Sequence, residues 1–160
     1  MKRLYAALLG LGVVGAPLAG QQVQIQTKSA PHEEEHIALT QQYRMMCTFA
    51  RRIEMASAGE EEDARTNAEK LVTAVENAAA GLDALAKVTD STQVAQIEEI
   101  RKYQAVAQSN VELLKAEVVK SPMQLRLAKT HAAAVREAAE KAEDAHAKML
   151  PKAEPPKANP

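Results

Sequence analysis

Residues 32–150 contain only one proline, Pro122, and two glycines, Gly59 and Gly81. These two residue types interrupt helices more strongly than any others, so a long stretch with so few of them favours an all-α fold. Hydrophobic residues make up 46% of the chain, yet it has no Trp and one Phe. The core is therefore expected to be aliphatic and rich in alanine, which suits closely packed helices.

Apolar residues recur at alternating spacings of three and four along four segments, as they do on the buried face of a helix. The expected helices span about 32–58, 60–88, 92–120 and 122–150. The inward stripes are expected to be His32, His36, Leu39, Tyr43, Met46, Ala50 and Ile53; Ala64, Ala68, Leu71, Val75, Ala78, Leu82 and Leu85; Ile97, Ile100, Gln104, Ala107, Val111, Leu114 and Val118; and Leu125, Ala128, Ala132, Val135, Ala139, Ala142, His146 and Met149.

Residues that favour helix ends mark the boundaries. Pro31, followed by three glutamates, suits the first turn of the first helix. Asp90 or Ser91 is expected to cap the third helix. The sequence Ser-Pro-Met-Gln at 121–124 has the form of a capping box and is expected to start the fourth helix.

Long helices joined by such short turns pack as antiparallel neighbours. One domain is therefore expected over residues 31–150, an up-down-up-down four-helix bundle. The same stripes would also suit a coiled-coil dimer in which helices pair between molecules. Gln104 is the polar interruption of the third stripe, and a buried polar residue of this kind can set the register.

The N-terminus has the features of a secretory signal. A basic start, Met1 to Arg3, precedes an apolar run from Leu4 to Ala19 that ends in small residues, which predicts a cleaved signal peptide over residues 1–20. The run is too short and too rich in glycine for a stable membrane span. Gln21 stands where a lipid-bearing cysteine would be required. The protein is therefore expected to be periplasmic or secreted, with no membrane insertion of the mature chain.

The segments that flank the bundle are expected to be poorly ordered. Residues 21–30 are polar and lack a helical stripe, and residues 151–160 contain four prolines. They predict a flexible N-terminal segment and a disordered, proline-rich tail.

Charge and cysteine content narrow the functional classes. Two of the 20 basic residues belong to the signal, which leaves 18 against 21 acidic residues and no basic block, so nucleic acid is not expected as a partner. Cys47 is the only cysteine, so no intramolecular disulfide forms. Its amphipathic surroundings favour a small buried hydrophobe over an intermolecular disulfide or a reactive thiol.

The segment His32 to His36 reads His-Glu-Glu-Glu-His and matches the zinc pattern H-E-x-x-H. In the extended protease pattern a glycine and a third histidine follow, but Leu39 and Gln42 occupy those positions. Peptidase activity is therefore not expected.

Topology suggests a different metal site. In an up-down-up-down bundle the start of the first helix lies beside the end of the fourth, so His32 and His36 should approach His146 and Met149. Imidazole and thioether ligands suit zinc or copper, and haem iron less well here. The arrangement is similar to that of cytochrome b562-type bundles, a resemblance that implies axial ligation by His146 with His36 or Met46.

Two functional hypotheses follow. The first is an exported, non-enzymatic bundle that acts by contact, with a partner protein, with itself or as a structural or adaptor component of the envelope. An exposed apolar surface would support it, and complete burial of all four stripes within one chain would weaken it. The alternative is a small metal- or haem-binding bundle with His32, His36, His146 and Met149 as ligands.

Overall fold

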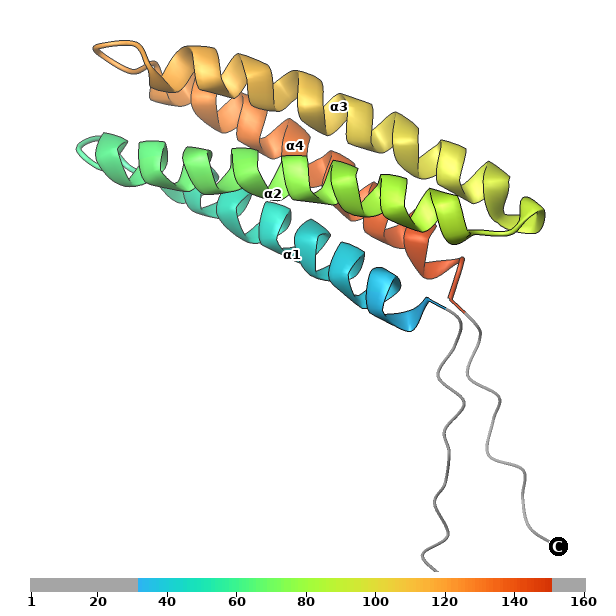
Figure 1. The fold of residues 1–160 in the computed structure, drawn as a ribbon. Helices are drawn as coiled ribbons and strands as arrows, with labels where there is room; N and C mark the ends of the chain where they lie inside the picture. The colour runs from blue at the N-terminus through green and yellow to red at the C-terminus, as the bar shows by residue number, and fades with distance from the viewer. Residues whose placement is uncertain (1–31, 151–160) are drawn as a thin grey trace, which may run out of the picture.

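A computed structural model describes residues 32–150, which form four α-helices: α1 (Glu33–Met55), α2 (Glu61–Val88), α3 (Val94–Val118) and α4 (Leu125–Ala147). A short 3-10 helix, η1 (Ser91–Gln93), precedes α3. Successive helices run in opposite directions, and α1 and α3 each pack against both α2 and α4 (Figure 1). The four-helix bundle is thus confirmed. Pro31, the expected signal and the expected flexible segments lie outside the described residues.

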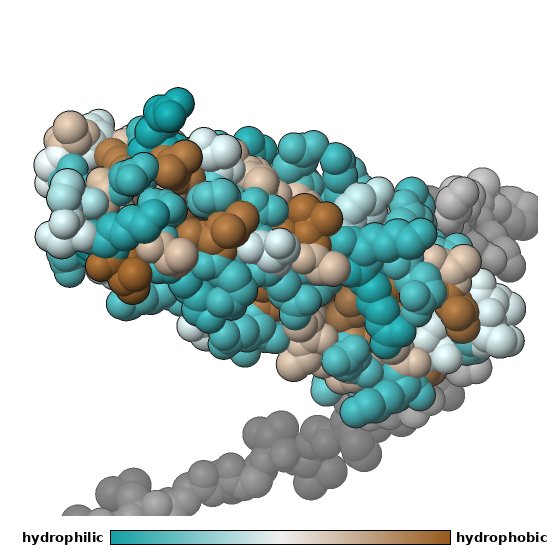
Figure 2. Space-filling view, turned by 90° about the horizontal axis from the view of Figure 1, so that it is seen from above, coloured by the Kyte–Doolittle hydropathy of each residue, from teal (hydrophilic) through white to brown (hydrophobic). Residues whose placement is uncertain are grey.

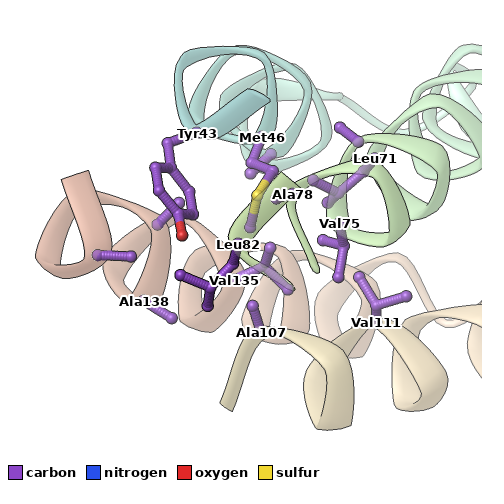
Figure 3. Packing of buried hydrophobic residues seen from close by; sticks show 14 of the residues in the cluster. Tyr43, Met46, Leu71, Val75, Ala78, Leu82, Ala107, Val111, Val135 and Ala138 are labelled. Carbon is purple, nitrogen blue, oxygen red and sulfur yellow. The ribbon is translucent and has the colours of Figure 1, made fainter. Parts of the chain in front are cut away.

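The core is formed by the inward stripes, as expected from their spacing. Figure 3 shows side chains from all four helices meeting around Leu82 and Val135. Two predicted positions, Val118 and Leu125, are only half-buried, and the side chain of Glu117 is buried in place of Val118. The core also takes in alanines that the stripes omitted, Ala74, Ala138 and Ala145.

Each helix is shorter than expected. The helix ends differ from the expected positions by one to three residues, except that α2 ends at Val88 as expected. The expected cap of the third helix lies one element earlier: the Asp90 carboxylate accepts a hydrogen bond from the Thr92 amide (2.8 Å) and starts η1, while α3 itself begins after Gln93 without a side-chain cap.

The expected start of the fourth helix is wrong. Ser121 and Pro122 lie in the turn before α4, which begins at Leu125 without a side-chain cap. Met123 explains the difference, because its buried side chain packs with Ala56 and Ala64 in a second, smaller cluster. The chain turns inward to bury Met123 before the helix can begin, and this burial outweighs the capping box.

Polar contacts between helices fix their register. Gln104 lies inside, as expected, and its side-chain amide donates to the Val75 carbonyl (2.8 Å). Between α1 and α4, Arg136 pairs with Glu54 (2.8 Å) and Arg44 with Glu143 (2.9 Å). These pairs are partly exposed, so each contributes modestly to stability while specifying the alignment of the helices. Within residues 32–150 no helix has the length and apolar character needed to cross a bilayer.

The packing around the two glycines of the bundle predicts opposite effects of alanine. A Cβ at Gly81 would lie 3.5 Å from Leu39 Cδ1, an ordinary contact, in the interior of α2. Gly81→Ala should therefore raise the free energy of unfolding by about 0.5–1 kcal/mol, because alanine loses less backbone entropy in a helix. Urea unfolding followed by circular dichroism measures the change.

Gly59 provides the control. Its φ of 95° is left-handed, so Gly59→Ala should lower the free energy of unfolding by about 1–2 kcal/mol. A loss of stability in Gly81→Ala would contradict the packing, since it would mean that α1 and α2 approach more closely than described.

Candidate functional site

Two of the residues expected at a metal site meet inside the bundle. His36 lies in the first turn of α1 and His146 near the end of α4, and their side chains are 8% and 1% exposed. His36 Nδ1 lies 2.7 Å from His146 Nε2. The ring centroids are 4.9 Å apart. The difference between this distance and the 2.7 Å between the nitrogens is about the sum of the two ring radii, so the nitrogens lie close to the line that joins the ring centres. They therefore point at each other and share a hydrogen bond.

Thr40 sets the positions of the protons in this pair. Its hydroxyl donates to the His36 carbonyl oxygen (2.9 Å) and lies 3.3 Å from His146 Nδ1. Because a hydroxyl has one proton to donate, its oxygen accepts the Nδ1 proton of His146. His146 Nε2 then carries a lone pair, and His36 donates to it from Nδ1. The result is a chain of hydrogen bonds from His36 through His146 to Thr40, with both rings neutral.

Burial favours this neutral state. It lowers the pKa of His146 to about 4, and the nearby His36 acts in the same direction. Burial also lowers the pKa of His36, with a further contribution from His32 and an opposing one from Glu35. A proton added to the pair would place a charge in the apolar end of the core, where it is poorly solvated.

Other buried groups complete this end of the bundle. The Tyr43 ring lies edge-on to His146, with centroids 6.5 Å apart, and its buried hydroxyl has no hydrogen-bond partner among the described residues. Burial raises the pKa of Tyr43, so the hydroxyl stays protonated. Met149 follows α4 and packs in the main core, while its carbonyl accepts from the Gln93 amide (3.0 Å).

His32 does not lie on the inward stripe, and its expected inward position is wrong. It precedes α1 and has a left-handed backbone (φ 65°), so the helical spacing does not set the direction of its side chain. The side chain is exposed. His32 and His36 therefore do not share a helical face as the H-E-x-x-H zinc pattern requires.

The geometry limits how a metal would bind. Two nitrogens at about 2.0–2.1 Å from one ion in tetrahedral geometry are about 3.3 Å apart. The 2.7 Å separation of His36 and His146 therefore has to widen before an ion enters. Within residues 32–150 no group of three or more His, Cys, Asp or Glu side chains is arranged to hold a metal. Met149 or water would have to supply the remaining ligands.

Cys47 and Met46 belong to the packing. Cys47 is half-buried against the core, and burial together with Glu140 and Glu143 raises its pKa to about 11, which keeps the thiol protonated. A protonated thiol reacts slowly, in line with the expected packing role. Met46 is fully buried and Met45 is exposed.

A second candidate site is a surface that the sequence patterns did not single out. On the side of α3 opposite the core lie five exposed residues, which we name the outer stripe: Ala105, Val106, Ser109, Leu113 and Ala116. Val106 and Leu113 are 48% and 49% exposed. Figure 2, which looks down on the bundle from the side of α3, shows apolar side chains interrupting the hydrophilic surface.

Comparison with protein-family models, with curated proteins and with solved structures finds no match to this chain. Its function therefore has to be inferred from the two sites themselves.

The histidine pair predicts a specific acid sensitivity. The folded-state pKa of His146 lies below its unfolded value, so its contribution to stability is complete above about pH 6.5 and is lost as the pH falls towards 4. The loss should be about 2–3 kcal/mol. Urea unfolding at pH 7.5 and pH 4.5 measures it.

His146→Gln removes the titration of His146, so the free energy of unfolding should depend less on pH than it does in the wild type. His131→Gln, on the seam between α3 and α4, is the matched control and should retain the full acid loss. Equal pH dependence in His146→Gln and in the wild type would show that the buried pair does not control acid stability.

Proposed function

We propose that this chain is an exported, non-enzymatic helical bundle that acts by protein–protein contact, as a structural or adaptor component of the cell envelope. The observation that carries the proposal is the outer stripe of α3. The inner face of α3 already packs in the core, so α3 presents apolar side chains on two faces. An apolar surface that residues 32–150 leave uncovered is typical of a contact site. Export rests on the signal-like residues 1–20.

The four inward stripes do not supply this contact surface. Nearly all of their side chains are buried within one chain, so helices of a partner have no access to them. This burial weighs against a coiled coil that shares the core stripes. It directs the contact hypothesis to the outside of α3, where Val106 and Leu113 are half-exposed.

Site-specific photo-crosslinking in producing cells tests the proposal. A photoreactive amino acid at Ser109 should give a discrete adduct, because this residue lies at the middle of the outer stripe. The same probe at Glu76, on the exposed face of α2, is the matched control and should give none. Leu113→Glu should abolish the Ser109 adduct. Equal labelling at both positions, or no adduct at Ser109, would contradict contact through α3.

A second candidate function is binding of zinc or copper by the histidine pair. The favouring observation is that His36 Nδ1 and His146 Nε2 converge from two helices on one point. Thr40 already holds the other ring nitrogen of His146, which is the partner that a metal-bound imidazole requires. An ion that replaced the shared proton would have His36 and His146 as ligands, with Met149 at the same end of the bundle.

Titration of the purified protein with zinc or copper(II) tests this candidate. His36→Gln and His146→Gln should each abolish binding, and Thr40→Val should weaken it about 10- to 100-fold through loss of the support to His146. His32→Gln is the control, because His32 is exposed, and it should bind as the wild type does. Binding that depends on His32 but not on His146 would rule out the buried site.

A further inference from the structure

The outer stripe of α3 has an unusual charge pattern. The nine residues from Tyr103 to Val111 include no charged side chain. Lys102 borders this stretch on its N-terminal side and Glu112 on its C-terminal side. The apolar surface thus has a positive boundary at one end and a negative boundary at the other.

The charges at these two boundaries determine in which orientation a second copy of α3 can bind without placing like charges together. A parallel copy of α3 would place lysine against lysine and glutamate against glutamate. An antiparallel copy turned about Ser109 brings Lys102 of each chain to within about 6 Å, along the helix axis, of Glu112 of the other, which is favourable at both ends. The surface is therefore complementary to itself when it is turned end to end, as an isologous two-fold contact requires.

Charges further out favour the same antiparallel orientation. Glu98 and Lys120 lie at equal separations of eleven residues from Ser109, on opposite sides. They are about 33 Å apart along one chain, so they cannot pair within it. In an antiparallel pair centred on Ser109, Glu98 of one copy lies opposite Lys120 of the other. Both side chains are largely exposed, and within one chain each pairs only with a neighbour along the sequence, Glu98 with Arg101 and Lys120 with Glu117.

The size of the side chains allows close approach. Three members of the outer stripe are small, namely Ala105, Ser109 and Ala116. Ala105 and Leu113 lie four residues on either side of Ser109, so Leu113 of each copy packs over Ala105 of the other. Small residues opposite large ones let two helices interdigitate without a gap.

From this pattern we infer that the partner at the outer stripe is a second copy of this chain, bound antiparallel along α3 with a two-fold axis close to Ser109. The inference rests on the proposed contact function and names its partner. Each copy contributes one helix face, which places the interface in the small class that associates weakly and reversibly.

Sedimentation velocity over a range of concentrations tests the dimer with the purified mature chain. The wild type should shift from monomer towards dimer as the concentration rises. Leu113→Glu should raise the dissociation constant at least about tenfold, because a carboxylate would be buried against apolar side chains. Met55→Glu, at an exposed apolar residue of α1, is the matched control and should leave the equilibrium unchanged. Circular dichroism confirms that each variant folds.

A charge exchange tests the orientation. Glu98→Lys places lysine opposite Lys120 of the other copy and should raise the dissociation constant about three- to tenfold. Adding Lys120→Glu should return the dissociation constant towards its wild-type value. Within one chain Glu98 pairs with Arg101 and Lys120 with Glu117, and the double variant repairs neither of these pairs. Recovery therefore reports the contact between copies.

Each outcome separates this inference from the proposed function. A monomer at every concentration, with a Ser109 adduct to a different protein in cells, would overturn the dimer and leave the contact function standing. A dimer that Leu113→Glu does not weaken would place the interface elsewhere. A dimer without recovery in the double charge variant would overturn the antiparallel orientation.

Discussion

Burial of four apolar stripes, of which those of α2 and α4 are rich in alanine, is the constraint on which the rest of the structure depends. Small side chains such as Ala78 and Ala132 let the helices approach closely, and the leucines and isoleucines fill the layers between them. Because one chain closes this core, the start of α1 and the end of α4 lie at the same end of the bundle (Figure 1). That position brings His36 and His146 together, although 110 residues separate them in the chain.

Both candidate sites arise from features that the aliphatic core leaves unsatisfied. The His36–His146 pair is polar and buried, so it depends on Thr40 and on mutual hydrogen bonding to remain neutral. The outer stripe of α3 is apolar and exposed, so a contact that excludes water would stabilise it. Packing alone requires neither feature, which is why function is sought at these two places.

Features carried by local patterns were predictable from the sequence. The spacing of three and four identified most core residues, and topology placed His36 beside His146. His32 was misplaced because helical phase does not extend to a residue with a left-handed backbone. The start of α4 was misplaced because burial of Met123, a tertiary contact, outweighed a local capping signal. Thr40 and the outer stripe of α3 were missed, since both emerge only when the positions of the helices around them are known.

Carbodiimide cross-linking of mixed isotopically light and heavy protein tests the account most directly. We propose that one chain closes its own core and leaves the outer stripe of α3 for a second copy. The Glu76–Lys115 and Glu99–Lys148 pairs, 3.9 Å apart between neighbouring helices, should then cross-link within a single isotope. A Glu98–Lys120 cross-link should combine both isotopes. Mixed isotopes in the first two pairs would mean that the helices pair between molecules, and a missing Glu98–Lys120 product would contradict the contact along α3.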